Sequence, residues 1–409
     1  MLPERNPPSR LRCRLANPME ANGMPDTAHA PEKAIPHVPP GTTVIVTGGT
    51  GFIGGRLVER LAKDGAEVTC LIRGNDAGMR LHRAGAYIRK IDMTDAAAVD
   101  EALRGVDLVF HLAYDWGNTA WNFKALRSLI KGCHANGCKR LVHVSSFVVY
   151  DIPDQGELTE DTSDTPAGEG YAHTKLALET ELLVAVRETG LPAAIVQPTI
   201  VYGPYSRPWT LDPADMLKFG TVVLPDAGEG ICNAVYVDDV VSGMILAAMR
   251  PEAVGQRYLL SGPEPITWKE FYEGVARAIG AKGPRYQPVN GILRANAKHR
   301  KLLRMASDPR TVMRKVAGIG FVRKAVSKGL RVLPSRARSM ARDTLYGPAL
   351  RQRGRVHMPN PGHLQFLQGR STIRSAKARQ ELGYTPVENF ESGMKTTAQY
   401  LESIYRDAP

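Results

Sequence analysis

The chain has 409 residues, of which 43% are hydrophobic and 23% charged, and its formal net charge is +12. This length can hold two domains, or one domain with a large lobe, and the composition supports a buried core, which excludes a wholly disordered protein. No apolar run reaches the roughly 18 residues that a membrane-spanning helix needs. The five cysteines are scattered and odd in number, which favours free thiols and a cytoplasmic location.

Residues 1–40 are rich in Pro, Ala and Asn, and no apolar block precedes a cleavage site. We therefore expect a disordered N-terminal arm rather than a signal peptide.

The first predicted strand, Val44–Val46, leads into the segment TGGTGFIG at residues 47–54, and a helical pattern and a second strand follow. Glycines here supply a tight turn, a backbone surface without side chains and a close helix–strand contact. Free N–H groups and a partial positive charge at a helix N-terminus bind a pyrophosphate. The pattern predicts a dinucleotide site formed by Gly48, Thr50, Gly51, Phe52, Ile53 and Gly54.

The second predicted strand ends at Ile72 and is followed by Arg73. A site that prefers NAD usually has an acidic residue at this point, whereas a cation suits the extra phosphate of NADP. We favour NADP over NAD, with a solvated surface arginine as the alternative reading of Arg73.

Strands and helices alternate through the first half of the chain, which predicts a parallel, doubly wound α/β sheet. After Gln197 the pattern breaks into loops, returns at Ala234–Met249 and Gln256–Ser261, and ends in smaller helical elements such as Trp268–Ile279. The expected strands are Val44–Val46, Val68–Ile72, Ala86–Ile91, Leu108–Leu112, Leu141–Val144 and Ala194–Gln197, and the expected helices include Ala96–Arg104, Trp121–Asn136 and Ala172–Glu188.

Tyr171 and Lys175 lie one helical turn apart, on the same face of a predicted helix. A phenol has an ordinary pKa near 10, so a tyrosine that acts as acid or base near neutral pH needs a nearby cation. Ser146 follows a buried strand at the rim of the sheet, where its hydroxyl can polarise the oxygen that Tyr171 protonates. An ordinary exposed tyrosine–lysine pair is the competing interpretation.

The positive charge belongs to one segment: residues 285–360 hold 19 Lys and Arg against two acids, and the rest of the chain has a net charge of −5. Apolar residues from Val312 to Leu330 recur near helical spacing, and Lys and Arg side chains lie mostly on the opposite side of this predicted helix. We hypothesise that residues 294–345 form a basic amphipathic surface that rests on an anionic membrane, which would make the protein peripheral. An acidic partner or a solvated region is an alternative. Nucleic acid is disfavoured because the segment has few aromatic residues to stack bases.

Cys133, His134 and Cys138 are the residues nearest to a metal-ligand pattern, but no second cluster accompanies them, so we expect no metal.

Eight ordered motifs together resemble the extended short-chain dehydrogenases/reductases, the NAD(P)-dependent epimerase/dehydratase superfamily that includes sugar epimerases, flavonoid reductases and 3β-hydroxysteroid dehydrogenases. They are TGGTGFIG, IDMTD (91–95), HLAY (111–114) with Asn122, VSSFVVY (144–150), YAHTK (171–175), QPTIVYGP (197–204), YVDDVVSGM (236–244) and SAKARQELGYTP (375–386).

The resemblance implies a Rossmann-type dinucleotide-binding domain at 41–200, to which 234–262 return, and a smaller, discontinuous C-terminal substrate lobe at 201–233 and 263–409. It implies catalytic roles for Ser146, Tyr171, Lys175 and Asn122. It also places Asp92, Met93, Leu112, Ala113, Tyr114, Pro198 and Ile200, with Tyr171 and Lys175, along the cofactor. As in relatives, the helices at 121–136 and 172–188 could pair with those of a second copy to form a homodimer.

Residues that differ from the family's motifs limit the class of substrate that we expect. Phe147 and Val148 replace the acidic pair of nucleotide-sugar dehydratases, and Cys232, Ile200 and Gln197 stand where diphosphate-binding epimerases carry polar donors. We therefore expect an oxidoreductase acting on a secondary alcohol or ketone of a hydrophobic, small-molecule substrate. A sugar epimerase, and a non-catalytic dinucleotide-binding protein that regulates a partner or membrane contact, remain alternatives.

Overall fold

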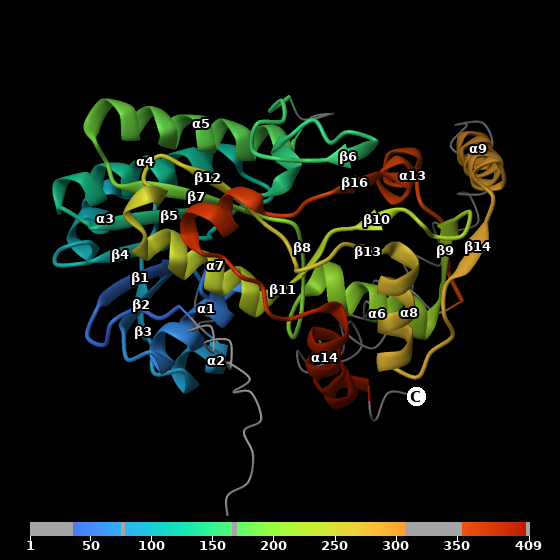
Figure 1. Cartoon of the computed structure of the whole chain (residues 1–409), viewed down its shortest axis with the longest axis horizontal. Coiled ribbons are helices and arrows are strands. Elements are labelled where there is room, and N and C mark those ends of the chain that lie inside the picture. The colour runs from blue at the N-terminus through green and yellow to red at the C-terminus, as the bar shows by residue number, and fades with distance from the viewer. Residues whose placement is uncertain (1–35, 75–77, 166–169, 307–353, 406–409) are drawn as a thin grey trace, which may run out of the picture. The chain divides into compact units, whose positions relative to one another are not determined.

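Seven parallel strands form the central sheet, in the order β12-β7-β5-β4-β1-β2-β3 (Figure 1). The computed structural model of the protein describes residues 36–74, 78–165, 170–306 and 354–405. The strands are β1 (Thr43–Thr47), β2 (Glu67–Ile72), β3 (Tyr87–Lys90), β4 (Leu108–His111), β5 (Arg140–Val144), β7 (Ala193–Pro198) and β12 (Arg257–Leu260). The predicted doubly wound α/β sheet is confirmed.

Helices cover both faces of this sheet because successive strand residues point to opposite faces. In β1, Val44 and Val46 belong to one buried cluster, together with Leu57 and Met244, whereas Ile45 belongs to the other. The first cluster lies under α1 (Phe52–Lys63) and α7 (Val237–Met249), and the second under α3 (Ala96–Ala102), α4 (Thr119–Ala135) and α5 (Tyr171–Thr189). Figure 1 shows the two helical layers.

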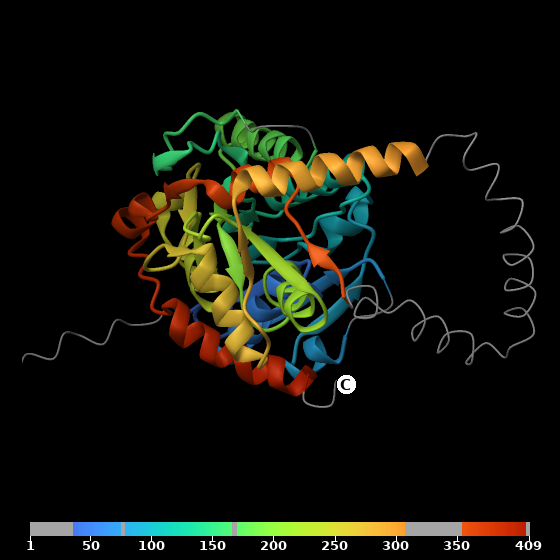
Figure 2. The same cartoon turned by 90° about the vertical axis from the view of Figure 1, so that its right-hand side faces the viewer.

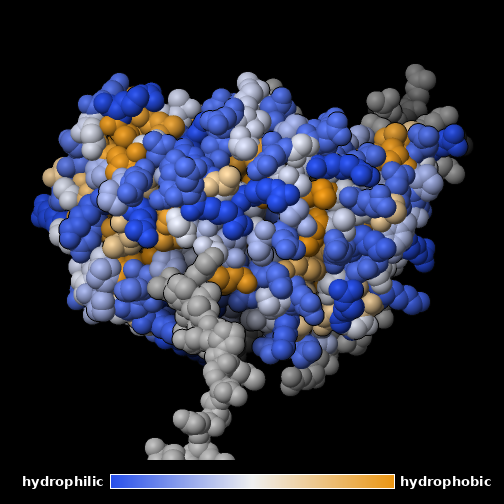
Figure 3. Space-filling model, in the orientation of Figure 1, coloured by the Kyte–Doolittle hydropathy of each residue, from blue (hydrophilic) through white to orange (hydrophobic). Residues whose placement is uncertain are grey.

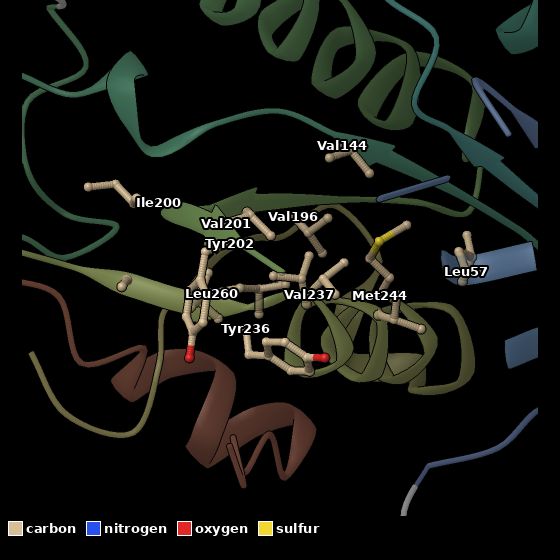
Figure 4. Packing of buried hydrophobic residues seen from close by; sticks show 14 of the residues in the cluster. Leu57, Val144, Val196, Ile200, Val201, Tyr202, Tyr236, Val237, Met244 and Leu260 are labelled. Carbon is tan, nitrogen blue, oxygen red and sulfur yellow. The ribbon is translucent and has the colours of Figure 1, made fainter. Parts of the chain in front are cut away.

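The first cluster extends from the sheet toward the C-terminal helix α14 (Phe390–Tyr405). Figure 4 shows Val237 and Met244 of α7 directed toward Val196 and Val144 of the sheet. Tyr202 and Tyr236, from the paired strands β8 (Ile200–Tyr202) and β11 (Ala234–Tyr236), lie at the end of the cluster near α14. One apolar core therefore runs from the sheet into the region that follows it.

That following region is built from short, interleaved elements. Two ends of the chain segment 285–360 flank one strand: β14 (Arg285–Gln287) and β15 (Val356–His357) both pair with β9 (Thr221–Pro225). Figure 2 shows α9 (Val289–Ala306) leaving this small sheet. The other elements are α6 (Asp212–Phe219), β10 (Ile231–Cys232), β13 (Ile266–Thr267), α8 (Trp268–Ala278), α13 (Pro361–Gln368), β16 (Arg370–Thr372), which pairs with β6 (Gln155–Glu157), and the short helices α2 (Gly78–Arg83), η1 (Phe147–Val149), η2 (Arg207–Leu211), η3 (Pro251–Ala253) and η4 (Ala378–Leu382).

The last residues of the predicted N-terminal arm are ordered against α1. Val38 is buried, its N–H donates to Asp64, and the Arg60 guanidinium donates to the carbonyl of Pro36. Burial of Val38 explains why residues 36–40 differ from the expectation, whereas residues 1–35 lie outside the described part of the chain.

Most of the predicted basic amphipathic surface also lies outside the described residues, including the stripe from Val312 to Leu330. The face shown in Figure 3 is largely hydrophilic, with its apolar residues in separate patches. Within the described ranges, no helix has both the length and the apolar character to cross a membrane.

Candidate active site

The glycine turn connects β1 to α1 and lies against the end of β4. Gly48 has a positive φ of 74°, and a Cβ atom there would lie 2.7 Å from the backbone nitrogen of Ala113. A Cβ on Gly54 would lie 2.3 Å from the carbonyl oxygen of Gly48. The turn and the helix can therefore approach this closely only because both positions are glycine. Gly51 is the N-cap of α1 and leaves exposed backbone at the helix N-terminus. This cradle fits a dinucleotide pyrophosphate.

The glycine turn lies at the carboxyl end of β1, next to the carboxyl ends of β4 and β2. The strand order of the sheet reverses between β1 and β4. The predicted Leu112 and Ala113 follow β4, and their N–H groups donate to the Thr47 hydroxyl at 3.2 Å. Phe52 and Ile53 are half-buried in the first turn of α1, and Thr50 is exposed. Pro198 ends β7.

Ser146, Tyr171 and Lys175 converge from two elements. Ser146 is the N-cap of η1 just after β5, and Tyr171 is the first residue of α5, hydrogen-bonded to Ser146. Lys175 is 4% exposed, and its Nζ lies 6.0 Å from the ring centroid of Tyr171. The structure thus places the three predicted groups side by side, because β5 ends and α5 begins at the same rim of the sheet.

The expected lowering of the phenol pKa by Lys175 is not observed in this arrangement. Burial raises the pKa of Tyr171 to about 12, although the hydrogen bond from Ser146 acts in the opposite direction. Lys175 donates instead to the carbonyl oxygen of Val144 at 2.8 Å, and burial lowers the pKa of Lys175 to about 8. At neutral pH the phenol of Tyr171 therefore carries its proton.

Asn122 holds a loop through both ends of its amide. It is 2% exposed, its Oδ1 accepts from the Asp115 N–H at 2.7 Å, and its Nδ2 donates to the Asp115 carbonyl at 2.9 Å. Both ends of the amide are occupied, so Asn122 fixes the loop from Tyr114 to Asn118 that follows β4.

Arg73 lies at the end of β2 with its side chain 58% exposed. Its Nη1 is 2.6 Å from Asp115 Oδ2, and its guanidinium lies 5.0 Å from the ring centroid of Trp121. The pairing with Arg73 lowers the pKa of Asp115. The predicted Asp92 is exposed and accepts from the Thr94 N–H, whereas Met93 is buried in the sheet core. Arg73 thus has a carboxylate partner that the sequence did not indicate.

Aromatic rings surround the phenol of Tyr171. Trp116 stacks on Tyr171, with ring centroids 4.7 Å apart and an interplanar angle of 21°. Tyr114 meets Tyr171 edge-on at 5.2 Å, and Lys175 Nζ lies 4.8 Å from the Tyr114 centroid. Tyr114, one of the predicted cofactor residues, is therefore in direct contact with the ring of Tyr171. No sequence pattern marked Trp116.

A buried polar network lies behind Lys175. Glu179, one turn further along α5, is 0% exposed, and both of its oxygens accept from Gln197 Nε2 at 3.0 Å. The Gln197 Oε1 accepts from Tyr150 at 2.8 Å, and Arg257 lies 3.6 Å from Glu179. The amide of Gln197, which stands where relatives carry a diphosphate-binding arginine, therefore points into the core. The i+4 spacing from Lys175 was the signal for Glu179.

A largely apolar cavity of about 260 Å³ is lined by chain neighbours of Ser146 and Tyr171. Phe147 follows Ser146 in the chain, Ala172 follows Tyr171, and both line the cavity. Ile200, predicted to contact the cofactor, is 2% exposed and lines this cavity too. Further lining residues are Val148 of η1, Ile231 of β10, Phe366 of α13 and Ile373, together with polar residues that include Asp151, Asp154 and Asn233. Cys232, which occupies the expected arginine position, is fully buried.

The sequence pattern of the NAD dependent epimerase/dehydratase family matches residues 44–261, from β1 through the end of β12. The chain belongs to this family. It is therefore an NAD(P)-dependent oxidoreductase or epimerase of the extended short-chain dehydrogenase type, as the motifs predicted. Within the described residues, no three His, Cys, Asp or Glu side chains cluster in a way that could hold a metal ion.

Relatives of the family include both reductases and epimerases. The 2-alkyl-3-oxoalkanoate reductase of Stenotrophomonas maltophilia is 28% identical over 253 residues, which cover 58% of this chain and 76% of that protein. Sterol demethylase protein B of Methylococcus capsulatus is 30% identical and covers 59% and 76%. The structure of UDP-glucose 4-epimerase from Thermus thermophilus in complex with NAD shares the fold, with a TM-score of 0.61 and 21% identity over 90% of this chain and all of that chain.

Proposed function

We propose that this protein reduces a ketone of an apolar small molecule to a secondary alcohol, with NADP as the preferred cofactor. The observation that carries the proposal is the convergence of Ser146, Tyr171 and Lys175 beside the glycine turn and an apolar cavity. The chemistry that a nicotinamide cofactor supplies at such a site is hydride transfer at a carbinol carbon.

In this proposal Tyr171 is the proton donor. Its phenol is protonated at neutral pH, the form that a ketone reduction consumes, and Ser146 is its hydrogen-bond partner. Ser146 holds the carbonyl oxygen of the substrate, and Tyr171 transfers its proton to that oxygen as the alcohol forms. Lys175 is the cation that steadies the phenolate left behind, after exchanging its bond to Val144.

The walls of the cavity support an apolar substrate. Phe147 and Val148 offer no acid or base for eliminating water, and Ile200 offers no donor to a diphosphate. Burial of Cys232 removes a further position for a diphosphate ligand. Relatives named as a 2-alkyl-3-oxoalkanoate reductase and a sterol demethylase protein agree with such a substrate class. A sugar epimerase is the less favoured reading.

The test of this proposal is turnover by a Tyr171→Phe variant. Without the phenolic proton we expect kcat for NADPH-dependent reduction of ketones to fall by at least about 100-fold, because proton transfer contributes 10²- to 10⁴-fold. Binding of NADPH, measured by fluorescence titration, should persist, since Phe keeps the ring. Tyr87→Ala, at an exposed tyrosine on the edge strand, is the control. Equal rates in Tyr171→Phe and the wild type would contradict the assignment.

NADP preference is proposed from Arg73, the cation at the end of β2. The 2′-phosphate of NADP would compete with Asp115 for the guanidinium, and a phosphate carries the greater charge. We expect Arg73→Gln to raise the Kd for NADP about tenfold and to change the Kd for NAD by less than about twofold. An equal effect on both cofactors, measured by calorimetry, would contradict NADP selection.

The domain division, a homodimer through α4 and α5, and contact of residues 294–345 with an anionic membrane stay predictions. Arg127 and Glu181, 2.5 Å apart, join α4 to α5 within one chain, which keeps the two helices together as a single surface.

A further inference from the structure

Trp116 differs from other exposed side chains because it lies against the proposed proton donor. Its indole is 78% exposed, although one face stacks on Tyr171. Tyr114 meets the indole edge-on at 5.1 Å. A large aromatic side chain left open to water at a reactive group is typical of a surface that is covered when a ligand binds.

The backbone around Trp116 is fixed on both sides. Asp115 is held by Asn122 and Arg73, and its Oδ1 accepts from the Gly117 N–H at 2.9 Å. Asn118 caps α4 by accepting from the Trp121 N–H at 3.0 Å. The position of the indole is therefore set by hydrogen bonds of its neighbours, so its outer face is available without loss of the loop's structure.

Resting on the proposed function, we propose that Trp116 is a specificity-determining residue that stacks on a flat, ring-bearing ketone whose carbonyl oxygen reaches Tyr171 and Ser146. Aromatic faces attract flat rings through offset stacking, at centroid separations of 4.5 to 7 Å, in addition to the area that is buried. A ketone with an unbranched alkyl chain gains only the free energy of burying its apolar surface. The apolar cavity is lined by Phe147 and Ala172, the residues that follow Ser146 and Tyr171 in the chain, and it can take an attached apolar group.

The kinetic test compares α-tetralone with an unbranched ketone of the same number of carbon atoms, using NADPH and the full chain. We expect Trp116→Ala to lower the ratio of kcat/KM for the ring ketone over the unbranched ketone by about three- to tenfold. Trp116→Phe keeps an aromatic face and should hold the ratio within about twofold. Tyr87→Ala, which removes an equally exposed aromatic from β3, should leave the ratio unchanged.

Two kinetic outcomes would overturn this inference while leaving the proposed function intact: an equal loss for both ketones in Trp116→Ala, or the same shift in the ratio for Trp116→Phe. Turnover of neither ketone by the wild type would count against the proposed function instead.

A binding measurement in a variant that cannot turn over separates the two ideas further. Tyr171→Phe retains the ring on which Trp116 stacks. With NADP present, α-tetralone should quench its tryptophan fluorescence, and the quench should vanish in the double variant that also carries Trp116→Phe. Quenching by NADP alone, with no further change on adding α-tetralone, would assign the indole to the cofactor and overturn the inference.

Discussion

The buried amine of Lys175 serves the proposed reaction and also affects the stability of the folded protein. The pKa of Lys175 is about 8 in the folded protein, below the ordinary lysine value of 10.5, because burial disfavours the charged form. Below pH 8 the lysine is protonated in both the folded and the unfolded chain, and burying that charge destabilises the fold. The cost disappears as the pH rises from about 8 to 10.5, where the folded chain holds fewer protons than the unfolded chain.

We therefore predict that Lys175→Met raises the free energy of unfolding of the cofactor-free protein at pH 7, by at most about 3 kcal/mol, while abolishing turnover. The lost bond to Val144 reduces this gain. Urea unfolding at pH 7 and pH 10 should show a gain that is much smaller at the higher pH. Lys124→Met, at an exposed lysine of α4, should change neither value by more than about 0.5 kcal/mol. A gain of equal size at both pH values would show that apolar packing, and not charge burial, is its cause.

At the residue scale, motif spacing predicted the groups that converge but not their partners. Ser146, Tyr171 and Lys175 lie together as expected. The sequence did not predict that Asn122 bonds the backbone of Asp115 or that Gln197 bonds Glu179. A hydrogen bond to a backbone group, or to a residue distant in sequence, leaves no periodic signal.

At the scale of elements, the contact between the glycine turn and α1 sets how closely a phosphate can approach the helix N-terminus. Gly54→Ala places a methyl group against the Gly48 carbonyl, and backbone atoms must move to admit it. We predict a loss of about 1–3 kcal/mol in the free energy of unfolding, and a Kd for NADP raised at least tenfold.

The matched control is Gly291→Ala in α9, where a Cβ atom would meet nothing within 4 Å. This substitution should stabilise the protein by up to about 1 kcal/mol, because alanine favours a helix more than glycine does. Urea unfolding and cofactor titration of both variants provide the measurement. If Gly54→Ala bound NADP as tightly as the wild type, the close approach would have no role in the cofactor site.

At the scale of the whole molecule, the cavity beside Tyr171 depends on segments that are distant in sequence. Asn233 donates to the Ser371 carbonyl at 2.9 Å and accepts from the Ile373 N–H at 2.9 Å, so it ties the end of β10 to the segment after α13. Ser261, after β12, donates to the carbonyl of Ile373, and Tyr384 donates to the carbonyl of Ser261 at 2.9 Å. These bonds hold Ile373 in place as a wall of the cavity.

The sequence by itself determined the parallel, doubly wound sheet, the family and the three groups at the rim of the sheet. Each of these follows from local patterns: apolar runs, glycines at a turn, and side chains one helical turn apart. Only the tertiary structure decided that Arg73 pairs with Asp115, that Trp116 covers Tyr171, and that α13 closes the cavity beside Phe147. These contacts join residues from separate loops and helices, and no spacing within one element encodes which of them will meet once the chain folds.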